Sequence, residues 1–371
     1  MAIDSVECCK AAIFPCPAPA ELEPAWRSLA ARAEGSVFLS WPWIGTLLTL
    51  FASSALLVRI EKESRLVGLA LLGRDTRPGR LPMMKTSFCL NESGDPAVDR
   101  ITIEYNDILA ETASETDARG AFLELLAARG DWRSLRLAGV GPGWSEACAH
   151  ASLAYRPLAP PQPAPWSDLS GLEDGDPLSA LSRNSREQIR RSLRFFEESG
   201  ALAIERAEDA GPALEWFAEM AALHTETWTK RGRQGAFQGP EFALFHRRLI
   251  EAHFAEQVPD MLRLRAGDRV LGYLYNLRWR GVVHTYQSGF LYGEDPRWRP
   301  GLAAHLLAMR LYAREGASAY RFLGGQARYK ASLSNRTDEL QWLTAYRPGA
   351  MSALEDGARA LKRAVRALVT P

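Results

Sequence analysis

Cysteine is scarce in this chain of 371 residues, and its pattern excludes two kinds of stabilised fold. There are five cysteines, an odd number, and no two of them form a C-x-x-C pair. A disulfide framework and a structural zinc site are therefore not expected. The first ten residues, MAIDSVECCK, lack the apolar stretch of a secretory signal. We therefore expect a protein of the reducing cytoplasm.

The sequence also lacks an excess of charge of either sign. Its 45 Lys and Arg residues nearly balance its 44 Asp and Glu residues, which leaves a net charge of +1. Binding of DNA needs a basic surface that releases counterions, so no DNA partner is expected. Hydrophobic residues make up 47% of the chain, which is enough for a packed core in one large domain or two ordinary ones.

Long apolar runs are rare, and residues 37–58 are the stretch that is long and uncharged enough to suggest a membrane span. This stretch contains Pro42 and several hydroxyl residues, so it is weakly apolar on insertion scales. It divides into an expected helix over residues 43–51, a break at residues 52–54 and a strand that begins at Ala55. We therefore expect no stable membrane insertion.

Several common catalytic motifs are missing. The sequence contains no phosphate-binding P-loop and no serine-nucleophile motif. The G-x-G-x-G run that begins at Gly139 is not a dinucleotide fingerprint, because its third glycine comes one residue early and Pro142 removes an amide. His246 and His253 share a helical face, but no third ligand completes a metal site, so no metal is expected.

Prolines are concentrated in residues 155–168, which we predict to be a linker or an edge crossover. This stretch divides the chain into two halves of similar outline. Each half has a helix, then a strand that ends on glycines, then a helix; the predicted ranges are 118–131, 132–143 and 144–153 in the first half, and 302–317, 319–325 and 327–333 in the second. Gly139 and Gly324 hold equivalent places, which suggests a duplicated unit.

The segment YGEDPRWRPGLAAHLL, residues 292–307, combines a basic loop with a helix start. Pro300 suits the first turn of a helix. Free amides at that position favour an anion, and Arg297 and Arg299 add positive charge. The loop is either an ordinary basic turn or a phosphate site. The corresponding loop of the first half is acidic, so a phosphorylated cofactor is expected only in the second half; its acids are Glu111, Glu115 and Asp117.

Three further segments each have both a functional and a purely structural interpretation. Helical spacing places arginines of residues 182–196 on one stripe, which is either a solvated face or a basic wall beside a ligand cleft. Strand alternation places His284, Tyr286 and Ser288 on one face, with His284 either a core residue or a general base. The segment YRFLGGQARYKASLS ends a strand on two glycines and then presents Tyr329 and Lys330, which marks a tight turn or a ligand site.

These segments together resemble the GCN5-related N-acetyltransferase (GNAT) superfamily. More narrowly, they are similar to its tandem-domain branch, the BioF2-like or CelD-like acetyltransferases, which are related to the Fem peptidyltransferases. The resemblance is carried by LSRNSREQIRRSLRFFEESG, WTKRG, YQSGFLYGEDPRWRPGLAAHLL and YRFLGGQARYKASLS in the second half. In the first half it is looser and is carried by FLSWPWIGTLL and EYNDIL.

The resemblance implies a mixed α/β fold of two tandem GNAT-like domains, each a mostly antiparallel sheet with a splayed strand pair and flanking helices. The expected domains are residues 1–165, without a donor site, residues 166–350, which bind the donor and carry catalysis, and a C-terminal helix over residues 351–371. Acyl-coenzyme A (acyl-CoA) is the implied co-substrate, without a metal. The implied donor contacts are Gln287, Ser288, Arg297, Arg299, Gly301, Leu302 and Ala303. The usual Q/R-x-x-G-x-G/A loop has Trp298 at its first basic position here.

The implied reaction is transfer of an acyl group to an amine of a small molecule, sugar or peptide. His284 would take the proton of the amine, and Tyr286 or Tyr329 would protonate the leaving thiolate. Lys330 would reach into the same cleft. The expected acceptor contacts are Arg186, Arg190, Glu226, Trp228 and Lys330. The alternatives are peptidyl transfer from aminoacyl-tRNA, as in the Fem relatives, and a non-catalytic binding or scaffold module of a biosynthetic pathway; a monomer or homodimer is expected.

Overall fold

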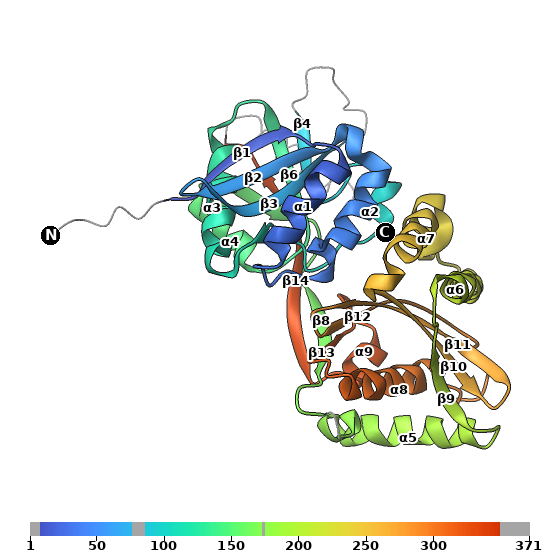
Figure 1. Cartoon of the computed structure of the whole chain (residues 1–371). Helices are drawn as coiled ribbons and strands as arrows, with labels where there is room; N and C mark the ends of the chain where they lie inside the picture. Colours follow the sequence, from blue (N-terminus) through green and yellow to red (C-terminus); the bar gives the residue numbers. More distant parts are fainter. Residues whose placement is uncertain (1–7, 76–85, 173–174, 349–371) are drawn as a thin grey trace, which may run out of the picture.

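The helices and strands follow nearly the same order in the two halves of the chain (Figure 1). The structure is a computed structural model that describes residues 8–75, 86–172 and 175–348. The first half contains β1 (Lys10–Pro15), α1 (Pro19–Ala30), α2 (Trp41–Phe51), β2 (Leu56–Lys62), β3 (Arg65–Arg74), β4 (Thr86–Leu90), β5 (Leu109–Ala110), α3 (Glu115–Ala128), β6 (Trp132–Val140) and α4 (Gly143–His150). The second half contains β9 (Leu202–Arg206), α6 (Ala210–Lys230), α7 (Pro240–His253), β10 (Pro259–Ala266), β11 (Arg269–Trp279), β12 (Val282–Phe290), α8 (Pro300–Arg314), β13 (Ala319–Arg321) and α9 (Arg328–Ser332). The duplication predicted from the glycine-ended strands therefore extends over nearly every element. The predicted C-terminal helix, residues 351–371, lies outside the described residues.

The remaining elements fall outside this shared order. They are β7 (Ala154–Pro157), β8 (Gln162–Asp168), α5 (Arg183–Glu197) and β14 (Arg336–Tyr346). The strands form one path in the order β1-β2-β3-β4-β6-β14-β8-β13-β12-β11-β10-β9. Pairing along this path is antiparallel except at β4 with β6 and at β12 with β13. The expected mixed α/β class, with a large and mostly antiparallel sheet, is confirmed.

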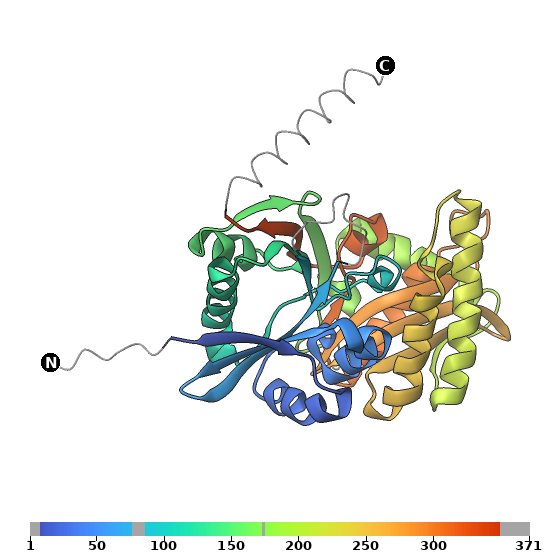
Figure 2. The same cartoon turned by 90° about the horizontal axis from the view of Figure 1, so that it is seen from above.

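Helices cover both faces of the sheet in the second half. The amphipathic pattern of α5 buries Ile189, Leu193 and Phe196 in the same core as α8. On the other face, α6 and α7 share a core with α1 and α2 of the first half. Figure 1 shows α5 and α8 below this part of the sheet, with α6 and α7 on its other side, and Figure 2 shows the two halves side by side. The halves are therefore joined by packed side chains as well as by strands.

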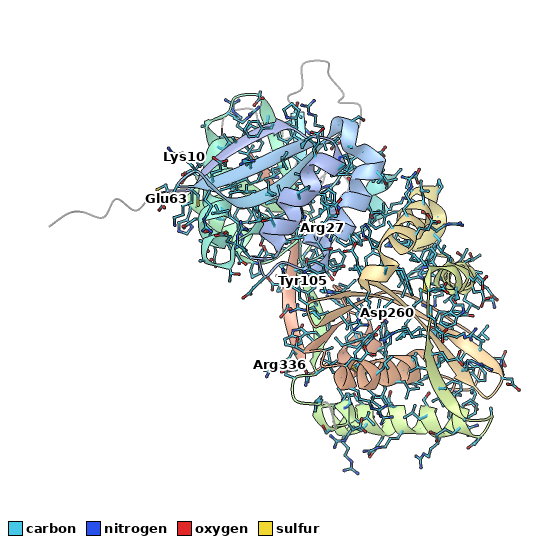
Figure 3. All side chains as sticks on the ribbon, viewed as in Figure 1. Lys10, Arg27, Glu63, Tyr105, Asp260 and Arg336 are labelled. Carbon is cyan, nitrogen blue, oxygen red and sulfur yellow. The ribbon has the colours of Figure 1, made fainter. Side chains whose placement is uncertain are left out.

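The strand β14 belongs to both halves. Its first part, from Arg336 to Leu340, pairs with β8. Its second part, from Gln341 to Tyr346, pairs with β6 and β7. Figure 3 labels Arg336 at the end of β14 that lies in the second half. The sheet thus passes from one half to the other without a break in hydrogen bonding.

The prediction of a linker at the proline-rich stretch is wrong, because residues 162–168 form β8 between β14 and β13. The carbonyl of Pro165 accepts a hydrogen bond from the N–H of Phe322, and that of Pro163 accepts one from Gly325. Alternate residues of a strand direct their N–H and C=O groups to the same side. Each proline lacks an N–H on the side of the strand that faces the chain after β13. The opposite side of β8, which pairs with β14, therefore keeps its hydrogen bonds.

The division predicted for residues 37–58 is confirmed. The helix α2 ends at Phe51, a short 3₁₀ turn covers Ala52–Ser54, and β2 follows. The hydroxyl of Ser40 caps α2 by accepting a hydrogen bond from Trp43. In the described parts of the chain, no helix has both the length and the apolar character needed to cross a membrane.

Candidate functional site

The strands β12 and β13 pair over three residues and then separate. The parallel pairs join Val282 to Ala319, Val283 to Tyr320 and His284 to Arg321. After Arg321 the chain turns away from β12, and Leu323 adopts a positive φ of 61°. Residues 285–287 of β12 therefore face residues 322–324 across a V-shaped opening instead of a hydrogen-bonded ladder.

A β-bulge lies at the opening. Tyr275 of β11 pairs with Gln287, and Asn276 pairs with Thr285, so Tyr286 has no partner on β11. Tyr286 and Gln287 consequently lie side by side in the wall of one cavity. The bulge also moves Ser288 off the face predicted for it, because Ser288 pairs with Leu274, which lies in the core beside α8. The simple alternation expected for this strand fails at that point.

A cavity of about 480 Å³ occupies the opening. Its wall is built from both halves of the chain. The lining comes from Arg100, Thr102 and Glu104 in the first half, from Thr285, Tyr286 and Gln287 on β12, from Phe322, Leu323 and Gly324 after β13, from Tyr329 and Lys330 on α9, and from the loop after α6. The structure thus brings together four residues singled out in the sequence: Tyr286, Gln287, Tyr329 and Lys330.

Two ionisable side chains of opposite charge meet at this cavity. Glu104 is only 7% exposed, and its Oε2 accepts a hydrogen bond from the N–H of Gly324 at 2.5 Å. The Nζ of Lys330 donates to the carbonyls of Gly324 at 2.6 Å and Leu323 at 3.2 Å. Burial raises the pKa of Glu104, against the opposing effects of the Gly324 hydrogen bond and of Lys330. Burial lowers the pKa of Lys330, and Glu104 opposes that shift.

The two tyrosines of the cavity differ in what their hydroxyl groups do. The hydroxyl of Tyr286 donates to the carbonyl of Thr102 at 3.0 Å, so it is committed to the first half. The ring of Tyr329 is 38% exposed and stacks on His305, with ring centroids 5.4 Å apart. Burial raises the pKa of Tyr329 to about 12, so its hydroxyl stays protonated at neutral pH. Tyr329 is therefore the phenol available to a ligand.

His284 lines a second cavity, of about 450 Å³, and not the first. It is 2% exposed and packs edge-on against Phe38 and Tyr105 of the first half. Figure 3 shows Tyr105 between the two halves. Burial and the charge of Arg321 lower the pKa of His284 to about 3. The imidazole is therefore neutral at physiological pH and is enclosed by aromatic rings.

The basic loop before α8 is held by its own neighbours. The guanidinium of Arg297 pairs with Asp295 at 2.7 Å, and Arg299 donates to the side chain of Gln188 at 2.8 Å. The indole N–H of Trp298 donates to the Leu291 carbonyl at 2.7 Å. Gly301 lies in the first turn of α8 beside the ring of Phe290, and the side chains of Leu302 and Ala303 are buried in the core. Only the backbone of the last two residues can therefore face a donor.

The predicted acceptor contacts on helices lie away from the cavity wall. Arg186 donates to the carbonyl of Leu181, and Arg190 is exposed on the same helix, α5, which packs with α8 on the opposite face of the sheet. Glu226 forms an exposed ion pair with Lys230 at 2.6 Å. Trp228 packs near Gly235, a residue of the loop that does line the cavity.

The equivalent opening in the first half is filled by the chain itself. The strands β4 and β6 pair up to Cys89 and Arg136 and then separate. The side-chain amide of Asn106 donates to Leu90 at 3.0 Å and to Ala138 at 3.1 Å, which bridges the gap. The close approach requires a glycine at residue 139, because a Cβ there would lie 2.4 Å from the carbonyl oxygen of Ile103. A ligand therefore has space at the opening of the second half and not at this one.

Glu104 is the ionisable residue with the deepest burial in the cavity wall, and sequence reasoning missed it. It lies in the segment EYNDIL, which carried only a loose resemblance in the first half. Its partner Gly324 is 220 positions away, and no local pattern encodes such a contact. Within the described ranges, no cluster of three or more His, Cys, Asp or Glu side chains is placed to hold a metal ion.

Comparison with known proteins agrees with this geometry. Residues 183–331 match the family model described as an acetyltransferase (GNAT) domain, so the second half of the chain carries a GNAT-type acetyltransferase domain. The wider fold is shared with solved structures over most of the chain. No curated protein matches the chain.

Three solved structures define that shared fold. FemX is 11% identical, covers 88% of this chain and 96% of its own, and has a TM-score of 0.60. The C-terminal domain (DUF2156) of a protein assigned as a lysylphosphatidylglycerol synthetase from Agrobacterium fabrum is 14% identical, covers 91% and 94%, and has a TM-score of 0.53. L-PGS from Bacillus licheniformis is 11% identical, covers 88% and 91%, and has a TM-score of 0.51.

Proposed function

We propose that the chain is an N-acyltransferase that moves an acyl group from acyl-CoA, or a related thioester, to an amine of a small molecule, sugar or peptide. The observation that carries the proposal is the opening between β12 and β13. Residues 285–287 do not pair with β13 there, and the opening leads into a cavity with Glu104 and Lys330 in its wall. A thioester that enters along the opening would lie beside strand edges and next to groups that exchange protons.

The chemistry requires charge stabilisation at one oxygen and one sulfur. The amine nitrogen attacks the thioester carbonyl, a C–N bond forms, and the C–S bond breaks. Backbone amides aimed at the carbonyl oxygen stabilise the negative charge that develops on it. The hydroxyl of Tyr329 lies in the cavity wall and can hydrogen-bond to the leaving sulfur. The amine loses one proton, and the thiolate gains one.

The start of α8 supports binding of the donor's phosphates. The positive end of the helix dipole favours an anion at this position. Among the described residues, the guanidinium of Arg299 donates to neutral oxygens, of Gln188 and Pro296, so a phosphate can replace those contacts readily. Arg297 must first exchange the carboxylate of Asp295 for a phosphate. The donor site is therefore expected to depend more on Arg299 than on Arg297.

A second candidate is peptidyl transfer from aminoacyl-tRNA. Two observations at the loop favour it: Trp298 replaces the usual basic residue, and Arg297 is already neutralised by Asp295. The net charge of +1 gives it no support. In this case the same cavity would hold the aminoacyl end of the RNA.

Calorimetric titration of the purified chain distinguishes these functions. We expect acetyl-CoA or a longer acyl-CoA to bind, and free coenzyme A to bind with similar affinity through its phosphates. If no coenzyme A species binds and tRNA co-purifies with the chain, the tRNA-dependent reaction replaces the proposal. If neither donor binds, the chain is a non-catalytic module.

A further inference from the structure

A segment of the first half, residues 101–107, runs between the two cavities of the molecule. Thr102 and Glu104 line the first cavity, whereas Tyr105 and Asp107 line the second. Asn106, between them, is anchored in the first half through its bonds to β4 and β6. The segment is thus fixed at one end by its own half and presents Glu104 to the other half.

Several contacts hold this segment against the second half, and three of them involve Tyr286, Gly324 and Arg321. The hydroxyl of Tyr286 donates to the carbonyl of Thr102. The N–H of Gly324 donates to Glu104. The guanidinium of Arg321 lies over the ring of Tyr105, 4.5 Å from its centroid. The position of Glu104 in the cavity is therefore fixed from both sides.

We infer that Glu104 is a catalytic residue that the first half supplies to the site of the second half: its carboxylate takes the proton that the acceptor amine releases. The inference rests on the acyl transfer proposed above. As the C–N bond forms and the C–S bond breaks, the proton passes from the amine nitrogen to Glu104. The departing thiolate takes a proton from the ammonium group of Lys330 or from water, and Glu104 later returns its proton to Lys330 or to water, which balances the step.

The composition of the cavity wall singles out Glu104. It is the one carboxylate among the described residues that line this cavity. His284 lines the other cavity, and the hydroxyl of Tyr286 is already bonded to Thr102. Lys330 has the opposite charge when protonated. A base must lie within hydrogen-bonding reach of the proton that it removes, and a carboxylate in the cavity wall can be approached by an amine bound in the cavity.

The charged groups around Glu104 decide its pH dependence. Lys330 and the N–H of Gly324 favour the carboxylate, while burial favours the neutral acid. The neighbouring phenols of Tyr286 and Tyr105 have raised pKa values and stay uncharged. Arg100 lies exposed at the rim of the same cavity. Burial is the largest effect and raises the pKa of Glu104. A base acts only when deprotonated, so the rate should rise with pH through the raised pKa of Glu104 and then level off.

If Glu104 has a purely structural role, its replacement by glutamine should leave the reaction rate unchanged. Glu104 also holds the loop at Gly324, and the amide oxygen of a glutamine can accept the same hydrogen bond. Glu104→Gln therefore preserves the loop contact and removes the base. Glu92 offers a matched control, because it is equally buried at 7% exposure, pairs with Arg136 in the first half and does not line the cavity.

The experiment follows thiol release from acetyl-CoA, with water or a panel of primary amines as the acceptor. We expect Glu104→Gln to lower kcat about a hundredfold or more, with little change in KM for acetyl-CoA. Its residual rate should rise with pH as the amine loses its proton without help. Glu92→Gln should keep the kcat and the pH profile of the wild type. A Glu104→Gln enzyme with the kcat and pH profile of the wild type would overturn the inference.

A measurement without substrate separates the inference from the proposed function. Infrared difference spectra of wild type and Glu104→Gln report the protonation of this carboxyl group alone. We expect it to titrate above the ordinary range of glutamate and to move further upward in Lys330→Gln. Titration in the ordinary range, or insensitivity to Lys330, would overturn the inference. Failure of the wild type to bind any acyl-CoA, with the infrared result as expected, would overturn the proposed function instead.

Discussion

The carboxylate of Glu104 and the backbone N–H of Gly324 lie 2.5 Å apart, although 220 positions of sequence separate them. The bond joins the segment that fills the opening of the first half to the loop that forms the opening of the second. Docking of the halves and assembly of the site are therefore one event.

Gly139→Ala tests the fit of the segment that carries Glu104. Gly139 has a φ of +62°, and an added Cβ would lie 2.4 Å from the carbonyl oxygen of Ile103 and 2.8 Å from the Cα of Glu104. We expect the free energy of unfolding to fall by on the order of 3 kcal/mol, because strain and overlap combine. Denaturant unfolding measures it. Gly141→Ala is the control, because nothing lies within 4 Å of its added Cβ; equal losses in the two variants would show that the close approach is unimportant.

The number of donor sites follows from the contrast between the two openings. Asn106 bridges the opening of the first half, while that of the second leads into a cavity. We therefore expect calorimetric titration with acetyl-CoA to give one site per chain. Two equivalent sites would mean that the segment around Asn106 leaves its place when the donor binds.

Reversal of charge at the start of α8 tests the expected phosphate site. In the double variant Arg297→Glu and Arg299→Glu, attractive contacts with a pyrophosphate become repulsive, so affinity for coenzyme A should fall at least about a hundredfold. The single variant Arg299→Glu should account for most of that loss, because Arg297 is already paired with Asp295. Arg183→Glu, at an exposed arginine of α5, is the control and should bind as the wild type does. Unchanged affinity in a folded double variant would place the donor elsewhere.

Buried histidines predict a loss of stability in acid. Burial lowers the pKa of His284 and of His305 to about 3, whereas an unfolded chain has an ordinary histidine pKa of about 6.5. Between these values the unfolded state binds more protons, so stability is fully present above about pH 6.5 and is lost as the pH falls toward 3. Each histidine should contribute a loss of about 2 kcal/mol between pH 7 and pH 5.

Urea unfolding at the two pH values measures this loss. His305→Gln should reduce the difference between pH 7 and pH 5 by about 2 kcal/mol, because its titrating group is gone. His150→Gln, at an exposed position at the end of α4, serves as the control and should keep the difference of the wild type. An unchanged difference in His305→Gln would show that water reaches this imidazole in the folded state.

The sequence predicted what depends on local patterns. The helix start at Pro300 and the break after Phe51 both report on neighbours within a few positions. It failed where a distant partner decides. The prolines of β8 predicted a linker, but their carbonyls accept hydrogen bonds from the chain after β13, which no local pattern indicates. The bulge at Tyr286 and the place of Glu104 likewise depend on strands and loops far along the chain.

The shared strand β14 has a consequence for how the chain matures during synthesis. The strand that lies between β6 and β8 is the last one in the described sequence, and its second part pairs with β6 and β7 of the first half. When only the first half has been synthesised, β14 is not yet present, so the edge of the sheet at β6 is open. Open strand edges attract other chains. The edge of β6 therefore stays open until residues 341–346 have been made and pair with it.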